Sequence, residues 1–475
     1  MAFSACEKIN DILSRIGFKK RTRIQERLLP FTEKRDIMGL SETGTGKTAC
    51  FVIPLVEELA EDPFGVHSLI LTPTRELAMQ TKEKVDIIGN YFGIKCEILH
   101  GGLDVHKQVA LLQKKPHIVI ATPGRLAAML CSEQSILAFK RAKKIVLDEA
   151  DLLLNGDQAL SVHKILSILT ERTKNVQLLL FSATDIAPRV LVKVRDRDYK
   201  LSARKKQERI ASEAGPSDSE HQSQTNSMDE ENTENISVKD SDAEKDGNKP
   251  DKAPMHIDDI IEKTSCPALW RMIYSRNFYT IDTRVSAVPK SITQEYAFVH
   301  RQAKDAYLAG LLMQEYKDAK VMVFMNKADN CAVLSEVLQE LGINAVGLSR
   351  HTDNKTRHSS FYRFRSGLAK VLLTTDVLSR GLDIKDISCV INYDLPNDFT
   401  DYIHRIGRTG RLDQSGYALS FVSAVDVSIL QDIQRQTATE MAEKELKPLT
   451  TARLMNKIAT HREFVTARIE KALSR

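Results

Sequence analysis

Three carboxylates stand together at the end of an apolar run near the middle of the chain. The run 145–147 is followed directly by Asp148 and Glu149, and Asp151 comes two residues later. Carboxylates this close repel one another, so the cluster is either a solvated loop or a site for a positively charged group. Taken alone, the stretch favours the solvated loop.

A phosphate-binding stretch upstream supplies the positive charge. It follows a short apolar run, 37–40, precedes a predicted helix and consists of Ser41, Glu42, Thr43, Gly44, Thr45, Gly46, Lys47 and Thr48. The glycines permit backbone conformations that turn N–H groups inward as an anion nest, and the helix N-terminus adds its dipole. The stretch resembles a Walker A loop, with Ser41 in the place of the first glycine.

The Walker A resemblance assigns chemistry to the acids. Lys47 would reach the β- and γ-phosphates of ATP, and the Thr48 hydroxyl would ligate Mg²⁺. Asp148 would hold the same magnesium through water, and Glu149 would orient and deprotonate the attacking water. The sequence thus predicts ATP and Mg²⁺ as cofactors.

The rest of the chain repeats one design that could position these groups. Apolar runs of strand length end in small, hydroxyl or charged residues within 67–77, 116–125, 143–151, 176–184, 320–328, 370–381 and 389–396. Helical periodicity lies between them, as in 76–92, and strands that alternate with helices predict parallel sheets buried on both faces. Ligands bind beyond the carboxyl ends of such strands. That edge would carry Thr72, Thr122, Asp148, Ser182, Asn326 and Thr375.

Composition sets the broad class. At 475 residues the chain exceeds one typical core, so at least two domains are expected. It is 42% hydrophobic and 28% charged, and a net charge of +5 permits a polyanionic partner without demanding one. The seven cysteines are scattered, which argues against a zinc site or disulfide framework. No apolar run is long enough to span a membrane, so we expect a soluble, intracellular protein.

One segment departs from the globular pattern. Residues 211–248 hold 11 acids, two lysines and no aromatic residue, a composition that predicts disorder. The segment is either a passive linker or a regulated acidic tether. The tether is conceivable because Ser217, Ser219 and Ser241 stand near acids that an acid-directed kinase could use.

The order of the motifs resembles that of a known family. The motifs are PTRELA at 73–78, GG at 101–102, TPGR at 122–125, DEAD at 148–151, SAT at 182–184, TTDVLSRGLD at 374–383 and HRIGRTGR at 404–411. Together they are similar to those of the DEAD-box ATP-dependent RNA helicases over most of residues 17–425. The amino-acid sequences of several stretches are most similar to those of the Dbp8-like subfamily, which is nucleolar and serves maturation of small-subunit ribosomal RNA.

The resemblance implies an α/β fold of two RecA-like domains, each a parallel sheet flanked by helices, that bind ATP and single-stranded RNA across a cleft. We place RecA-like domain 1 at 1–210, a disordered acidic insertion at 211–256, the end of domain 1 with the linker at 257–290, RecA-like domain 2 at 291–430 and a helical extension at 431–475. The tail 447–475 carries apolar residues at helical spacing and seven basic residues against two glutamates. It is either a helix packed on domain 2 or an auxiliary RNA contact.

The resemblance also implies nucleotide-site roles. Arg408 is similar to the family's arginine finger, Arg405 would lie close to the γ-phosphate, and Asp383 would touch the ribose. Gln25 would read adenine. The residues implied to couple the ATP and RNA sites are Asp151, Ser182, Thr184 and His404.

The implied RNA track contacts phosphates and sugars, so sequence specificity should be weak, and the 2′-hydroxyl would distinguish RNA from DNA. Domain 1 would contribute Thr74, Arg75, Gly101, Gly102, Thr122, Pro123, Gly124 and Arg125, and domain 2 would contribute Asn326, Arg357 and Thr375. ATP-driven closure would kink one strand and locally melt a short duplex.

Some positions depart from the family. Arg21 and Arg23 stand where the adenine-reading segment usually has prolines, and Phe3 is the best match for a stacking aromatic. A loop without those prolines should be less rigid, so we expect weaker selection of ATP over GTP. In 349–357, Arg357 survives but its usual neighbours do not.

Three activities fit these motifs. The first is an RNA-stimulated ATPase that remodels short duplexes, the second an ATP-gated clamp that turns over little, and the third, least favoured, a double-stranded-DNA translocase. The first predicts single-stranded RNA and short duplexes, in particular pre-ribosomal RNA, as partners. It further implies protein cofactors of ribosome assembly, no membrane, a monomer and a place in the nucleus and nucleolus.

Overall fold

The structure is a computed structural model. It describes residues 4, 6–29, 35–173, 175–188, 261–284, 288, 291–349, 352–376, 384, 386–410, 415–446 and 451–473. The acidic segment 211–248 therefore lies outside the described residues, and so does its predicted disorder. None of the described helices is both long enough and apolar enough to cross a membrane.

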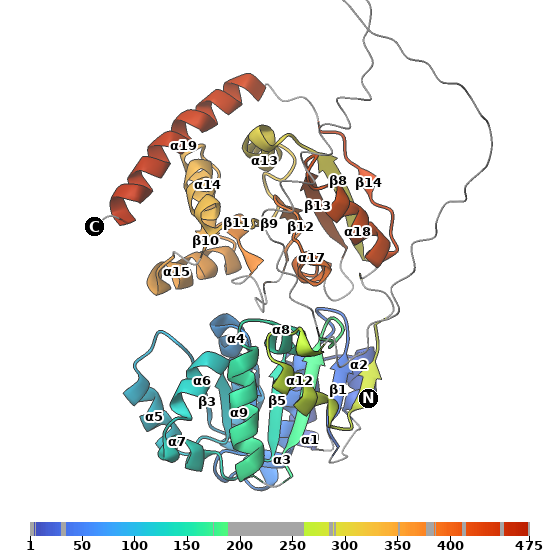
Figure 1. The fold of residues 1–475 in the computed structure, drawn as a ribbon, viewed down its shortest axis with the longest axis vertical. Helices are drawn as coiled ribbons and strands as arrows, with labels where there is room; N and C mark the ends of the chain where they lie inside the picture. The colour runs from blue at the N-terminus through green and yellow to red at the C-terminus, as the bar shows by residue number, and fades with distance from the viewer. Residues whose placement is uncertain are drawn as a thin grey trace, which may run out of the picture. The chain divides into compact units, whose positions relative to one another are not determined.

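Seven parallel strands form the first sheet, in the order β3-β4-β2-β5-β6-β1-β7 (Figure 1). The strands are β1 Ile37–Leu40, β2 Ser68–Leu71, β3 Cys96–Leu99, β4 Ile118–Ala121, β5 Lys144–Asp148, β6 Gln177–Ser182 and β7 Tyr279–Asp282. Strands β2, β4 and β6 are buried along their whole length. Continuous burial explains why these strands are apolar runs and not alternating patterns.

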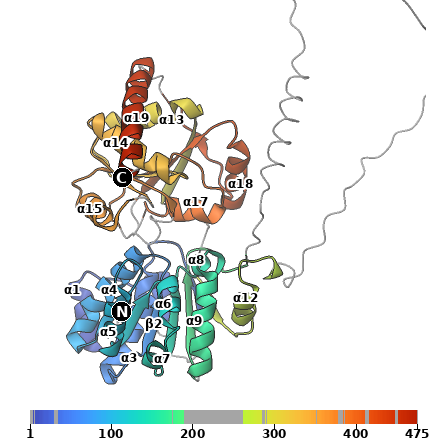
Figure 2. The ribbon, with the colours of Figure 1, turned by 60° about the vertical axis from the view of Figure 1, so that its left-hand side comes forward.

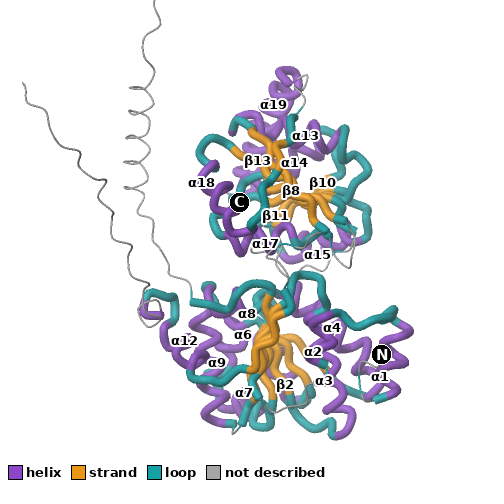
Figure 3. The backbone as a smooth tube through the Cα atoms, turned by 90° about the vertical axis from the view of Figure 1, so that its right-hand side faces the viewer, coloured by secondary structure: helices purple, strands orange, loops and turns teal. Residues whose placement is uncertain are grey.

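Helices enclose this sheet, as Figure 3 shows in purple around the orange strands. They are α1 Glu7–Arg15, α2 Arg23–Leu28, α3 Lys47–Glu61, α4 Arg75–Gly89, the 3₁₀ helix η1 Asn90–Phe92, α5 Val105–Gln113, α6 Pro123–Met129, α7 Glu133–Ala138, α8 Ala150–Asn155, α9 Ala159–Arg172 and α12 Pro267–Tyr274. We call the first sheet with these helices lobe 1.

The segment that follows residue 261 completes lobe 1. Helix α12 packs beside α9 (Figure 2), and its Trp270 is fully buried. Strand β7 pairs in parallel with β1 at the edge of the sheet. Arg276 fixes the approach to β7 because its Nη1 bonds Asp36 at 2.7 Å. The described residues 261–284 thus supply α12 and β7 to lobe 1, and the boundary that we placed at 257–290 stays a prediction.

The second sheet repeats the topology of the first. Its order is β10-β11-β9-β12-β13-β8-β14, the order of the first sheet with each number raised by seven. The strands are β8 Ile292–Phe298, β9 Val321–Phe324, β10 Ala345–Leu348, β11 Val371–Thr374, β12 Cys389–Asn392, β13 Gly416–Val422 and β14 Ala442–Glu443. Two parallel sheets of one topology confirm the predicted α/β fold class.

The helices of the second sheet, which with it make up lobe 2, include the C-terminal extension. They are η2 Arg301–Ala303, α13 Lys304–Met313, α14 Ala328–Glu340, α15 Asn354–Arg365, α17 Phe399–Ile406, α18 Val427–Thr437 and α19 Thr451–Leu473. Strand β14 belongs to the sheet although it lies beyond residue 430, where we ended domain 2. Helix α19 packs on α13 and α14 through Ile458 and Val465, both buried, as expected for a packed helix.

Candidate ATP and RNA sites

The phosphate loop lies between β1 and α3, as predicted. Gly44 and Gly46 have φ angles of +79° and +84°, conformations that only glycine adopts without strain. Lys47 is 7% exposed, and its Nζ donates to the carbonyls of Ser41 at 2.7 Å and Glu42 at 2.9 Å. These bonds hold the ammonium inside the loop, at the amino end of α3, where an anion would be stabilised.

The acids of the opening motif lie at the carboxyl end of β5 and are not a solvated loop. Asp148 is 4% exposed and Asp151 is fully buried, while Glu149 takes a left-handed conformation with φ +53° between the strand and α8. Burial, reinforced by the negative charge of Glu149, raises the pKa of Asp148 to about 7. Burial also lowers the pKa of Lys47, although the charges of Glu149 and Asp148 oppose that shift.

The raised pKa of Asp148 indicates that the nearby cations, among them Lys47, do not offset its burial and the negative charge of Glu149. The side-chain oxygens Oε2 of Glu149 and Oδ1 of Asp151 have no hydrogen-bond partner among the described residues. A buried carboxylate with a raised pKa is relieved by a bound cation. The residues therefore fit a magnesium-bound nucleotide, with Thr48 half-buried at the first turn of α3.

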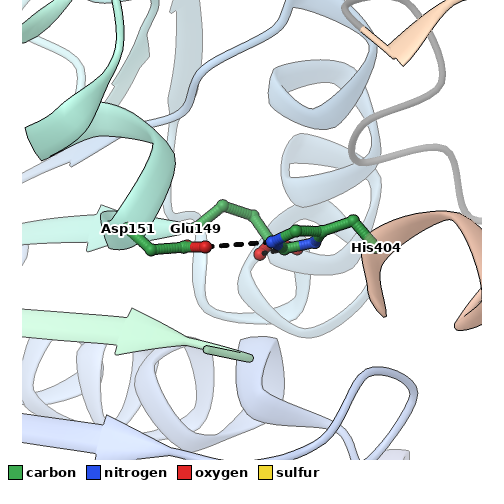
Figure 4. A group of neighbouring side chains, drawn as sticks. All are labelled: Glu149, Asp151 and His404. Atoms are coloured by element: carbon green, nitrogen blue, oxygen red, sulfur yellow. Dashed lines mark hydrogen bonds and ion pairs between the residues drawn. The ribbon is translucent and has the colours of Figure 1, made fainter. Parts of the chain in front are cut away.

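The four predicted coupling residues meet at one point. His404 Nε2 lies 2.9 Å from Asp151 Oδ2 (Figure 4). Thr184 Oγ1 donates to the same oxygen at 2.5 Å. Burial alone would raise the pKa of Asp151, but the charge of His404 and hydrogen bonds from His404, Thr184 and Ser182 lower it overall. Asp151 thus joins the SAT motif of lobe 1 to the HRIGRTGR motif of lobe 2.

Glu149 completes this cluster. Its Oε2 lies 4.0 Å from His404 Nδ1, and one ligand atom each from Glu149, Asp151 and His404 falls within 4.8 Å of the others. This trio could hold a metal ion, and it does not include Asp148, the acid that we predicted as a magnesium ligand. Since His404 Nε2 already bonds Asp151, we assign the trio to coupling between the motifs.

The adenine-reading segment is braced without the prolines. Thr22 and Gln25 form a capping box at the start of α2, in which Gln25 Oε1 accepts the Thr22 N–H at 3.1 Å. Thr22 Oγ1 donates to the Thr45 carbonyl at 2.7 Å, and Gln25 Nε2 donates to the Gly46 carbonyl at 3.2 Å. The segment is therefore tied to the phosphate loop. These hydrogen bonds limit the flexibility that we expected from Arg21 and Arg23 in place of the prolines.

The two arginines that we predicted at the γ-phosphate, Arg405 and Arg408, have different surroundings. Arg405 is 1% exposed, and every guanidinium nitrogen already donates within lobe 2: Nε and Nη2 to Asp376, Nη2 to Asn326 and Nη1 to the Asp394 carbonyl. This geometry suits assembly of lobe 2 and leaves no nitrogen for the γ-phosphate that we predicted beside it. Arg408 donates its Nε to the His404 carbonyl at 3.0 Å, one turn along from the coupling histidine.

A further contact joins the phosphate loop to this motif. Thr43 Oγ1 donates to the Gly407 carbonyl at 3.2 Å, and a Cβ at Gly407 would fall 2.2 Å from that hydroxyl oxygen. Only glycine permits so close an approach at position 407.

The predicted RNA-binding arginines lie in the first turns of three helices, Arg75 in α4, Arg125 in α6 and Arg357 in α15. Thr74 caps α4 and accepts the Leu77 N–H at 3.2 Å, so Arg75 begins that helix, and Pro123 begins α6. Burial lowers the pKa of Arg75, and the charges of Arg357 and Arg125 lower it further. A bound anion, such as an RNA phosphate, would offset the repulsion among these cations.

Unpaired donors support that interpretation. Arg125 Nη1 and Arg357 Nε are buried without a hydrogen-bond partner among the described residues. Gly102 has a φ of +88°, and a Cβ at Gly101 would lie 3.0 Å from Arg75 Nη2. A Cβ at Gly124 would meet nothing within 4 Å, so its backbone is open to a ligand.

The two remaining lobe 2 candidates are Asn326 and Thr375. Asn326 is exposed, yet its Oδ1 accepts from Arg405 at 2.7 Å and its Nδ2 donates to the Leu395 carbonyl at 2.9 Å. The Thr375 carbonyl accepts from the hydroxyl of Thr374 at 3.2 Å. Phe3 and Asp383 lie outside the described residues, so their predicted roles remain predictions.

Sequence reasoning missed two kinds of residue. Thr22 was discoverable, because Thr-x-x-Gln is a capping-box pattern. Asp376 and Asp394 were not, since an acid inside a motif gives no sign that it bonds an arginine elsewhere.

Comparison with known proteins gives the relatives of this chain. The family model "DEAD/DEAH box helicase" matches residues 22–190, and "Helicase conserved C-terminal domain" matches 303–413. The chain is 36% identical over 448 residues to a Dictyostelium discoideum protein named "Probable ATP-dependent RNA helicase ddx49", covering 92% of this chain and 72% of that protein. It is 33% identical over 439 residues to "ATP-dependent RNA helicase dbp8" of Schizosaccharomyces pombe, covering 92% and 81%.

Solved structures share the fold. Mss116p bound to single-stranded RNA and AMP-PNP aligns with a TM-score of 0.69 at 22% identity, over 95% of this chain and 80% of that one. Saccharomyces cerevisiae Dbp5 bound to RNA and ADP BeF₃ aligns with a TM-score of 0.67 at 23% identity, over 97% and 98%. The two lobes are therefore RecA-like domains. With its ordered motifs, its buried acids beside a phosphate loop and relatives of this identity, the chain belongs to the DEAD-box family of ATP-dependent RNA helicases.

Proposed function

We propose that the chain hydrolyses ATP through Lys47, Asp148 and Glu149 and uses the cycle to remodel RNA. The observation that carries the assignment is the contact of Asp151 with both Thr184 and His404. That contact ties the acid motif that serves hydrolysis to a motif of the second lobe. A change at the nucleotide would therefore reach both lobes through a single buried carboxylate.

Each residue has a separate task. Lys47 would stabilise the charge on the phosphates, and Glu149, whose Oε2 has no hydrogen-bond partner among the described residues, would accept the proton of the attacking water. Asp148 and Thr48 would hold Mg²⁺, which supplies positive charge to the phosphates when bound. Arg408, near His404, would supply positive charge to the transition state from lobe 2.

Two substitutions test the hydrolysis roles. Lys47→Ala should lose ATP binding, while Glu149→Gln should bind ATP and RNA but lower the RNA-stimulated turnover number by about 100-fold or more. Equilibrium binding and steady-state ATPase assays separate the two outcomes. Hydrolysis by Glu149→Gln at the wild-type rate would show that another group activates water.

RNA is the proposed polymer partner. The convergence of Arg75, Arg125 and Arg357 at helix starts gives phosphate contacts without base readout, so binding should be insensitive to base sequence. The altered adenine-reading segment was the reason to consider an ATP-gated clamp that turns over little. The Thr22–Gln25 capping box, which braces that segment, argues against the clamp. We therefore favour a helicase that turns over many times per RNA.

We further propose that the RNA is pre-ribosomal and that the protein works in the nucleolus with assembly cofactors. Support comes from the Dbp8-like wording and from the relatives named dbp8. Crosslinking in cells should recover small-subunit precursor RNA, with Glu149→Gln recovering more because its complex persists. Recovery of messenger RNA alone, or an absence from nucleoli by tagged imaging, would reject this assignment.

A further inference from the structure

Helix α19 lies beyond the stretch that the family model of the C-terminal domain matches, which ends at residue 413. Two arginines of α19 form ion pairs with lobe 2, each with a different helix. Arg468 pairs with Glu336 and Glu340 on the outer face of α14. Arg462 instead pairs with Asp305 at the start of α13 and donates to Asn330 at 3.2 Å.

Asp305 carries the contact into the interior of the lobe. Its side chain is 14% exposed, and its Oδ1 accepts the hydroxyl of Tyr393 at 2.7 Å. Tyr393 is 8% exposed and follows β12 directly, so its ring is fixed in the core. Lys304 holds the same residue from the backbone side, because its Nζ donates to the Tyr393 carbonyl at 2.8 Å.

The next residue, Asp394, reaches the functional edge. Its Oδ2 accepts the Asn326 N–H at 3.1 Å, and its carbonyl accepts Arg405 Nη1 at 2.5 Å. Arg405 in turn bonds the Asn326 side chain and Asp376. A path of hydrogen bonds and ion pairs, with the peptide link from Tyr393 to Asp394 as one covalent step, thus runs from α19 to Asn326, two residues beyond the end of β9.

We propose that Arg462 is a positioning residue for RNA binding, acting through the Asp305–Tyr393 bond on the loop that holds Asn326. The ion pair with Arg462 offsets the desolvation of the Asp305 carboxylate. Without Arg462, this carboxylate can turn toward water. Tyr393 then loses its acceptor, and a buried hydroxyl left unpaired loosens the backbone at Asp394. The proposal rests on the RNA-stimulated ATPase proposed above.

The expected effect falls on RNA and not on nucleotide. In the full-length protein, Arg462→Ala should raise the RNA concentration for half-maximal ATPase about three- to tenfold, the range that network couplings produce. The KM for ATP should change less than about twofold, since the phosphate loop lies on lobe 1 and bonds none of these groups. Tyr393→Phe keeps the ring and removes only the hydroxyl, so it should give a similar shift.

A matched variant separates positioning from anchoring. Arg468→Ala removes two ion pairs from the same helix but touches no member of the network, so its RNA half-saturation should match wild type. Arg462→Lys keeps a cation beside Asp305 and should restore part of the affinity. Because Arg462 and Tyr393 act in series, the double variant should be no worse than either single variant.

The measurements are steady-state ATPase with a single-stranded oligonucleotide of uniform sequence, anisotropy binding of the same RNA and thermal melting of each variant. An equal loss of RNA affinity in Arg462→Ala and Arg468→Ala would reduce α19 to an anchor and overturn the proposal. So would a Tyr393→Phe enzyme with wild-type RNA half-saturation. A wild-type protein without RNA-stimulated ATPase would instead contradict the proposed function, while anisotropy still tests the network.

Discussion

At the scale of single residues, burial gives the acids of the ATP site their chemistry. Asp148 ends a buried strand beside Glu149, and this surrounding raises its pKa to about 7. Asp151, only three positions on, is shifted the other way by His404, Thr184 and Ser182. One short motif thus holds a carboxyl that needs a cation and a carboxylate that already has its partners.

The raised pKa of Asp148 predicts a pH dependence of magnesium-nucleotide binding. Below pH 7 the carboxyl is protonated in the free protein, whereas the bound cation requires the carboxylate, so binding releases a proton. The affinity should fall by up to about tenfold per pH unit below 7. Calorimetry in buffers of different ionisation enthalpy measures the released proton, and Asp148→Asn should lose this component. A proton count that is the same in both proteins would assign the release elsewhere.

A second prediction concerns the brace on the adenine-reading segment. Thr22→Val keeps the size of the side chain but removes its bond to the Thr45 carbonyl and the N-cap of α2. Loss of an N-cap costs about 1 kcal/mol, so the KM for ATP should rise about fivefold while the turnover number changes little. Replacing Arg21 and Arg23 by proline in this variant should recover the affinity. If the prolines change ATP over GTP selection in the wild type more than Thr22→Val does, the brace is minor.

At the scale of elements, one ion pair connects the returning chain to the first sheet. Asp36 lies just before β1, and its Oδ1 accepts the Leu178 N–H of β6 at 2.6 Å. Its Oδ2 accepts from Arg276, which also reaches the Val176 carbonyl at 3.3 Å. The pair therefore joins β1, β6 and the segment that leads into β7.

Removing this pair should loosen the edge of lobe 1. Arg276→Met leaves the half-buried carboxylate of Asp36 without its cation, at a cost of about 2 kcal/mol. We expect a lower melting temperature and faster amide exchange in β7. Arg172→Met is the control, because the Arg172–Glu133 pair is exposed and should contribute under about 0.5 kcal/mol. Similar melting temperatures for the two variants would show that β7 is held by its strand pairing alone.

At the scale of the whole molecule, the duplicated topology explains where a long insertion is tolerated. Strand β6 ends before residue 211, and α12 and β7 follow residue 248 with their own contacts to α9 and β1. An insertion whose flanks are separately anchored adds little to either sheet.

Deleting 211–248 should therefore leave the RNA-stimulated turnover number within about twofold of wild type. The melting temperature should stay the same. The 11 acids of this segment would compete with RNA phosphates for Arg75 and its neighbours, so RNA binding should tighten, most at low salt. RNA titrations across a range of salt concentrations test this expectation. A large fall in melting temperature would mean that the segment is part of a core.

The sequence alone determined the local features of the molecule. Strands that are buried on both faces must be apolar throughout, which is why β5 and β6 could be located and why Asp148 and Ser182 could be placed at their carboxyl ends. A phosphate loop needs two glycines, a lysine and a hydroxyl residue in fixed order, so 41–48 could be identified from residue types alone.

Only the tertiary structure decided which distant groups meet. Arg405 and Arg408 stand three residues apart in one motif, yet Arg405 is enclosed by Asp376 and Asn326, whereas Arg408 bonds the carbonyl of His404. Likewise, nothing in the spacing from Asp305 to Tyr393 to Arg462 foretells that their side chains bond. Hydrogen bonds act over about 3 Å, and folding alone sets which residues come that close.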